Sequence, residues 1–133
     1  MEMFIENRSK FNFSETVEQI TNAAQTALWK IPHIHDLKET LKKSELDVLP
    51  VKVLEMCKPS LSYRILSKDS EKIFASMMPC RISVYQKEDG VTYISRMNAK
   101  ALAGTLQGES AEVMTKAFNE MEAVIAPFLY TQP

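Results

Sequence analysis

The segment from residue 80 to residue 97 restricts the fold more than any other part of the sequence, because it has the pattern of a β-hairpin. Ile82 and Val84 alternate with polar or aromatic side chains, which is the two-residue period of a half-buried strand. Asp89-Gly90 is a tight-turn dipeptide, and the residues up to Met97 return as the partner strand. The hairpin therefore predicts a mostly antiparallel sheet.

The rest of the chain alternates between strand and helix patterns. Strands are predicted at 3–7, 31–35 and 51–56, and helices at 13–30, 36–43, 59–66, 69–78 and 110–126. We expect Ser14 to cap the first helix and Asp69-Ser70 to cap the helix before Pro79. Pro32 places the second strand at an edge of the sheet.

The last predicted helix is strongly amphipathic. Its apolar residues step by four, three, four and three positions, and they are Met114, Phe118, Met121, Ile125 and Phe128. The order of all elements predicts an α+β fold, with a sheet of about five strands and helices packed on one face as a two-layer sandwich. The length of 133 residues and the presence of only 3 glycines predict a single domain over residues 1–133.

Charge and hydropathy exclude several classes of partner. Lys and Arg total 16 and Asp and Glu total 17, so the chain lacks the excess of basic residues that non-specific binding to nucleic acid requires. The start Met1-Glu2-Met3 has no basic segment, and no stretch approaches the roughly 20 apolar residues of a membrane span. We therefore expect a cytoplasmic protein that binds neither nucleic acid nor membrane.

Two cysteines lie where predicted strands meet prolines, in Cys57-Lys58-Pro59 and Pro79-Cys80. If their strands are antiparallel neighbours, both sulfurs lie at the same end of the sheet, whereas parallel strands would place them at opposite ends. Cys57 also precedes a helix N-terminus, where the helix dipole can lower a thiol pKa. A redox-switchable thiol pair, a soft-metal site and two small buried hydrophobes all remain open.

Methionine is unusually frequent, with 8 residues in 133. Met56 adjoins Cys57, and Met77-Met78 nearly adjoin Cys80. Thiolate and thioether ligands together favour monovalent copper, and simple core packing is the alternative. For Met114 and Met121, core packing is expected.

Histidine and arginine give weaker signals. His33 and His35 share one face of a predicted strand and could hold a metal, although no other ligand lies at a recognised spacing, so a solvated pair is the alternative. Tyr63-Arg64 and Arg81 could bind an anion near the helix start at Pro59, or they could be surface residues only. The sequence contains no phosphate-binding glycine loop and none of the common hydrolase motifs.

Three motifs taken in order resemble a known family. They are Phe13-Ser14-Glu15-Thr16-Val17, Cys57-Lys58-Pro59-Ser60-Leu61-Ser62-Tyr63 and Pro79-Cys80-Arg81-Ile82-Ser83-Val84-Tyr85. Their order and spacing resemble the domain of unknown function family 302, over about residues 3–128. The family usually has Asn, a good helix cap, where this chain has Lys58, and its glycine-containing turn after the first helix is replaced by Trp29-Lys30-Ile31-Pro32. The resemblance implies a small α+β fold, a dimer and no established activity.

These observations lead to a main hypothesis. We expect a small homodimeric binding or sensing protein with a partly apolar cleft at the sheet end that carries Cys57 and Cys80. Arg81 and Tyr63 would lie nearby, and Pro59 would start the adjacent helix. The cysteines would act as redox-responsive thiols or as ligands of a small molecule or soft metal. No cofactor is identified.

Two alternatives belong to different functional classes. In the first, the protein is a cysteine-dependent enzyme in which Cys57 is the nucleophile and His35 the base. His35 is also the third candidate metal ligand beside the two cysteines. In the second, the protein is a structural, homodimerising interaction module that buries the segment from Leu37 to Leu41, or its methionine-rich surface, against a second copy.

Overall fold

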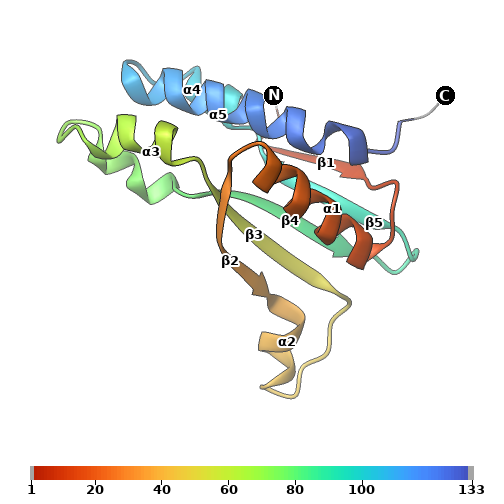
Figure 1. The fold of residues 1–133 in the computed structure, drawn as a ribbon. Coiled ribbons are helices and arrows are strands. Elements are labelled where there is room, and N and C mark those ends of the chain that lie inside the picture. The colour runs from red at the N-terminus through yellow and green to blue at the C-terminus, as the bar shows by residue number, and fades with distance from the viewer. Residues whose placement is uncertain (1, 132–133) are drawn as a thin grey trace.

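The computed structural model describes residues 2–131 and contains a five-stranded antiparallel sheet (Figure 1). The strands are β1 (Phe4–Arg8), β2 (Lys30–Asp36), β3 (Val51–Cys57), β4 (Cys80–Gln86) and β5 (Thr92–Met97). Their spatial order is β1-β5-β4-β3-β2, and each neighbouring pair is antiparallel. The α+β prediction is therefore confirmed. The single domain over residues 1–133 stays a prediction, and residues 1, 132 and 133 lie outside the described chain.

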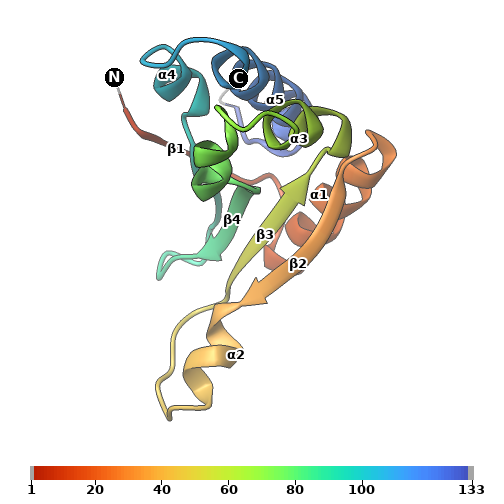
Figure 2. The same cartoon turned by 90° about the vertical axis from the view of Figure 1, so that its left-hand side faces the viewer.

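Within residues 2–131, five α-helices and two 3-10 helices accompany the sheet. They are α1 (Phe13–Thr26), α2 (Leu37–Lys42), α3 (Pro59–Leu66), α4 (Ala99–Ala103), α5 (Glu109–Ile125), η1 (Lys72–Met77) and η2 (Ala126–Phe128). Figures 1 and 2 show α1 across one face of the sheet, with α3, η1 and α4 gathered at one end and α2 projecting from the opposite end. Short α4 lies in a segment where the sequence suggested only a loop.

No helix within residues 2–131 combines the length and the apolar character that crossing a lipid bilayer requires.

The two faces of the sheet differ in burial. Leu54, Ile82 and Ile94 lie on the face that packs against the helices, and all three are fully buried. The residues that alternate with them form the other face, which we call the open face, and no described residue on it is fully buried. The open face includes Phe4, Glu6, Arg8, His33, His35, Val51, Val53, Glu55, Cys57, Arg81, Ser83, Tyr85, Tyr93, Ser95 and Met97.

Helix α5 closes the core over the sheet, and the predicted apolar stripe is confirmed in part, since Met121 and Ile125 are buried. Its buried residues include Val113, Ala117 and Met121. Met114 and Phe118, which the sequence placed in the core stripe, are only partly buried. The difference has a simple origin: Met114 and Phe118 directly follow Val113 and Ala117, and tertiary packing buried these two neighbours instead.

A buried guanidinium joins α5 to two strands. Arg96 on β5 donates two hydrogen bonds to the Glu122 carboxylate, at 2.7 and 2.8 Å, and a third to Asn7 Oδ1 at 2.6 Å. The Arg96 side chain is 6% exposed. These bonds connect β5 to α5 and β1, and they satisfy a charge that would otherwise be costly to bury.

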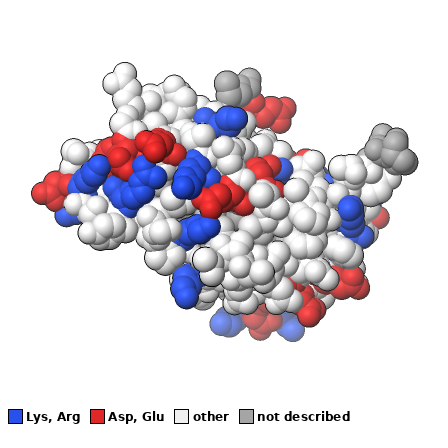
Figure 3. Space-filling view, turned by 45° about the horizontal axis from the view of Figure 1, so that its top comes forward, with Lys and Arg blue, Asp and Glu red and all other residues white. Residues whose placement is uncertain are grey.

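Ion pairs also connect α3 to α5. Arg64 contacts Glu109 and Glu112, and Lys68 contacts Glu109 at 3.2 Å. Arg64 and Lys68 hold the pKa of the Glu109 carboxyl below its usual value through hydrogen bonds. Figure 3 shows Lys, Arg, Asp and Glu interspersed on the helical side of the molecule rather than separated by sign. The pairs therefore position two helices relative to each other without creating a field of one sign.

Both predicted helix caps are wrong in detail. Asn12 caps α1, since its Oδ1 accepts from the Glu15 amide at 2.9 Å, and Ser14 lies inside the helix. The segment after Asp69-Ser70 is the 3-10 helix η1, which has no side-chain cap. Asp69 pairs with Lys72 at 2.6 Å instead.

Helix α1 ends in a conformation that normally requires glycine. Leu28 has a φ of 69°, its amide donates to Gln25 O, and the Trp29 amide donates to Ala24 O. This is the Schellman pattern of a helix end, in which the left-handed residue is usually Gly. The sequence lacks glycine in this turn, and the structure places the resulting backbone strain at Leu28.

We predict that Leu28→Gly stabilises the protein by about 1 kcal/mol, because glycine adopts this backbone conformation without steric cost. The Leu28 side chain is 74% exposed, so little packing is lost. Urea unfolding measures the change. The control is Leu28→Ala, which removes the same side chain but keeps the strain. Equal stabilities for the two variants would contradict this explanation.

Candidate functional site

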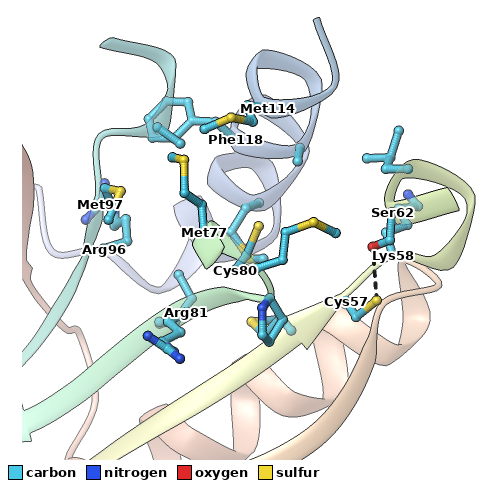
Figure 4. A pocket seen from close by; sticks show the side chains of 18 of the residues that line it. Cys57, Lys58, Ser62, Met77, Cys80, Arg81, Arg96, Met97, Met114 and Phe118 are labelled. Carbon is cyan, nitrogen blue, oxygen red and sulfur yellow. Dashed lines mark hydrogen bonds between the residues drawn. The ribbon is translucent and has the colours of Figure 1, made fainter. Parts of the chain in front are cut away.

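The antiparallel pairing of β3 and β4 brings the two cysteines to the same end of the sheet. Met56 is opposite Cys80 in the register, so Cys57 lies one residue beyond that pair. Of the two arrangements that the sequence left open, the structure has the antiparallel one. Both thiols are free and partly buried. Figure 4 shows Cys57 beside Ser62 and Cys80 nearer to Met77.

Cys57 is positioned by helix α3. Its Sγ lies 3.1 Å from Ser62 Oγ, in a hydrogen bond that holds the thiol against the first turn of the helix. Pro59 occupies the first turn as predicted, and Lys58 at the cap position makes no side-chain cap bond. The Lys58 ammonium binds Glu120 at 2.6 Å and lies over the Trp29 ring instead. Lys58 therefore connects the Cys-Lys-Pro turn to α5.

Cys80 is held in its thiol form. Burial raises the pKa of Cys80 above its ordinary value, and the neighbouring Cys57 adds to this effect. A thiol that retains its proton at neutral pH is a weak nucleophile and a poor anionic metal ligand. Cys80 therefore acts as a small, polarisable and uncharged side chain.

Both cysteines line a cavity of about 450 Å³ at the end of the sheet. It is bordered by the ends of β3, β4 and β5 and by residues of α3, η1, α4 and α5. Its volume is within the range of roughly 300–1,000 Å³ that is usual for small-molecule sites. The sequence predicted a cleft at this end of the sheet, but it gave no indication of the cavity's size.

The cavity wall is rich in sulfur. Among residues 2–131, every sulfur-bearing side chain except Met3 lines it. The lining methionines are Met56, Met77, Met78, Met97, Met114 and Met121. Thioether side chains are flexible and polarisable, so they adapt to apolar ligands of different shapes. The high methionine count was the sequence signal of this site, although spacing alone assigned Met114 to the core.

Most of the remaining lining is also apolar, with Leu61, Ile65, Phe74 and Phe118 among it. The charged residues in the wall are Lys58, Arg81, Arg96 and Glu122. Lys58 is paired with Glu120, and Arg96 is paired with Glu122.

The cavity extends around the end of the sheet. Met56, Cys80 and Ile82 line it from the helix-covered face. Arg81, Ser83, Ser95, Met97 and Phe4 line it from the open face. Because residues of both faces contribute, the cavity reaches from the core side to the open face.

Other predicted site residues lie elsewhere. Tyr63 is 72% exposed on α3 and does not line the cavity. Arg64 is engaged by the two glutamates of α5. Pro59 borders a separate shallow depression together with Trp29, and Trp29 also lines the main cavity. The predicted proximity of Arg81 to Cys57 and Cys80 is present in the cavity wall, whereas that of Tyr63 is not.

His35 is remote from Cys57. It is opposite Val53 in the register, four residues before Cys57, which corresponds to about 13 Å along the strand. Its Nε2 lies 3.3 Å from Glu55 Oε2, and its ring contacts His33 at a centroid distance of 4.2 Å. His35 therefore cannot serve as the base for Cys57 in this structure. Within residues 2–131, no group of three His, Cys, Asp or Glu side chains is arranged to hold a metal ion.

Comparison with known proteins gives a family and a fold. The family described as domain of unknown function DUF302 matches residues 5–128. A crystal structure of an uncharacterized conserved DUF302 protein from Bacillus stearothermophilus is similar, with a TM-score of 0.82 and 20% identity. The similarity covers 95% of this chain and 98% of the other. No curated protein sequence matches this chain.

We predict that Cys80 is alkylated by iodoacetamide more slowly than an unhindered thiol at neutral pH. Its rate should continue to rise at alkaline pH where an ordinary thiol has levelled off, because its raised pKa delays thiolate formation. Peptide mapping by mass spectrometry after timed labelling gives the rate at each pH. The urea-unfolded protein is the control, and there the delay should disappear. A Cys80 rate that matches free cysteine in the folded protein would contradict the assignment.

Proposed function

Because the chain belongs to the DUF302 family, whose description names no activity, we propose its function from the cavity: it is a binding protein that holds an apolar small molecule at the end of the sheet. The observation that carries this proposal is the cavity of about 450 Å³ with a sulfur-rich, largely apolar wall. Cavities of this size and lining bury most of the surface of a small ligand, and the hydrophobic effect drives the binding.

The wall supports binding better than catalysis. Cys80 retains its proton because burial raises its pKa, and His35 is too far from Cys57 to activate it. Lys58 and Arg96 are occupied by carboxylates. The described residues of the wall therefore offer shape and polarisable contact rather than an activated nucleophile or base.

The two thiols take part in this proposal as ligand-contacting groups. Cys57 and Cys80 line the same cavity, so one ligand can touch both and shield them from reagents. A redox response follows from the same position, since oxidising either sulfur would make an apolar wall polar. A monovalent soft metal is the competing occupant, and it would have to recruit thioethers such as Met77 beside the thiols.

We predict that a neutral apolar fluorophore, N-phenyl-1-naphthylamine, binds this cavity and quenches Trp29, the single tryptophan. Met77→Asp should weaken its binding at least tenfold, because a carboxylate in the wall must be desolvated when the probe enters. Fluorescence titration gives the dissociation constant. Native mass spectrometry of the freshly purified protein shows whether a small molecule or a metal is already bound.

The matched control is Ile73→Asp. Ile73 lies on the same 3-10 helix as Met77, is 75% exposed and does not line the cavity. Its probe affinity should equal that of the wild type. If both variants lose binding equally, or if the wild type does not bind the probe, the proposed function is wrong.

The projecting arm formed by residues 37–49 favours a second function, self-association. Helix α2 within it has no buried residue, and Leu37, Leu46 and Leu49 are 37%, 57% and 42% exposed. Figures 1 and 2 show the arm extending away from the rest of the molecule. Three lysines and three acidic residues balance along it, so two arms would not repel each other. We propose that a second copy of the chain covers these leucines.

We predict that the wild type sediments as a dimer and that the double variant Leu46→Glu, Leu49→Glu sediments as a monomer. The cause is that two carboxylates in an apolar contact cannot be desolvated without large cost. Sedimentation velocity over a dilution series measures the change. Leu66→Glu, at a leucine outside the arm that is as exposed as Leu49, should leave the dimer intact. A monomeric wild type would exclude this second function.

A further inference from the structure

The cavity has one charged group in its wall that makes no strong bond to the protein, and it lies at the opening. The Arg81 guanidinium makes no hydrogen bond within residues 2–131, and the nearest carboxylate oxygen, Glu55 Oε1, is 3.7 Å away. Its side chain is 61% exposed on the open face. By contrast, Lys58 and Arg96 in the same wall each bind a carboxylate at 2.6 and 2.7 Å. Within residues 2–131, Arg81 is therefore the one cation of this wall whose donors make no hydrogen bond.

We infer that the ligand of the cavity is an amphipathic carboxylate, with its head group at Arg81 on the open face and its apolar tail among the methionines. The inference rests on the proposed function and specifies the class of ligand. An Arg side chain presents donors in a planar fork that matches the two oxygens of a carboxylate. The geometry thus places an anion-binding group at the opening of a largely apolar space whose other charged groups are paired within the protein.

Two hydroxyl groups flank the same opening. Ser83 follows Arg81 by two residues on β4, and it is opposite Ser95 on β5. All three residues point to the open face, and all three line the cavity. Serine hydroxyls are neutral donors that can complete the hydrogen bonds of a head group without adding charge. A head group at this position meets one guanidinium and two hydroxyls on neighbouring strands.

Glu55 determines how much negative charge the opening accepts. It is opposite Arg81 in the register and is shared with His35, whose Nε2 is 3.3 Å from its other oxygen. A carboxylate with a single charge can take the free side of the guanidinium. A dianionic phosphate would bring a second charge close to Glu55, which is unfavourable. The arrangement therefore selects a monoanion over a dianion.

The interior selects the tail. Beyond Arg81 the wall includes Cys80, Met77, Met114 and Phe118, which offer no charged group, and its other charged residues are paired. Figure 4 shows Arg81 on one side of the cavity and Met77, Met114 and Phe118 on another. An unbranched or aromatic hydrocarbon that enters between them loses no polar contact and gains about 25 cal/mol for each Å² of buried surface.

The test is displacement of N-phenyl-1-naphthylamine by decanoate, 1-decanol and decyl phosphate at neutral pH. For the wild type, decanoate should displace the probe at roughly tenfold lower concentration than 1-decanol, because only the acid binds the guanidinium. In Arg81→Gln the acid should lose this advantage, while the affinity for 1-decanol stays unchanged. Arg8→Gln is the matched control, since Arg8 is on the open face outside the cavity and contacts the Tyr130 ring.

The outcomes separate this inference from the function on which it rests. Equal displacement by decanoate and 1-decanol, or equal weakening of both in Arg81→Gln, would overturn the carboxylate assignment while leaving an apolar binding site. Stronger displacement by decyl phosphate would overturn it in favour of a dianion. If the probe binds but none of the three compounds displaces it, the tail assignment fails too. A wild type that does not bind the probe refutes the proposed function itself.

Discussion

The buried Arg96 guanidinium fixes the arrangement on which the cavity depends. It joins β5, β1 and α5 through three short hydrogen bonds, and both Arg96 and Glu122 belong to the cavity wall. Removing one partner of such a pair lowers the free energy of unfolding by about 3–5 kcal/mol, because the other charge is left buried and unpaired. The position of α5 relative to the sheet is therefore set by directional bonds as well as by apolar packing. These bonds hold α5 away from the end of the sheet, so the cavity between them stays open.

The charges of the site follow a consistent division between wall and opening. Cations within the wall are neutralised by bound carboxylates, as with Lys58 and Glu120. The guanidinium at the opening has only a distant counter-charge. The paired cations within the wall position the helices, and the cost of removing them from water is offset by their carboxylate partners. The group at the opening keeps its bonding capacity for a molecule from outside, which is why its surroundings define the ligand class.

Local patterns in the sequence were sufficient for the strands and the hairpin, but not for the order of the strands or for the cavity. The alternation around Ile82 and Val84 and the Asp89-Gly90 turn predicted the hairpin, and the prolines beside Cys57 and Cys80 placed both thiols at strand ends. Met114 was misassigned because helical spacing identifies an apolar side without showing whether another surface touches it. The helix caps failed for a related reason: Asn12, Ser14 and Asp69 are all acceptable cap residues, and the choice depends on where neighbouring elements start the helix.

The edges of the sheet determine how copies of this chain can meet. Along β2, Pro32 has no amide proton, and the ladder is irregular between Lys30 and His33. At the other edge, the Tyr130 amide donates to Arg8 O and Ser9 bridges to Leu129, so the segment after α5 covers the end of β1. Continuous strand addition from chain to chain is therefore hindered at both edges. Both edges therefore disfavour the unbroken main-chain pairing on which fibrillar growth depends.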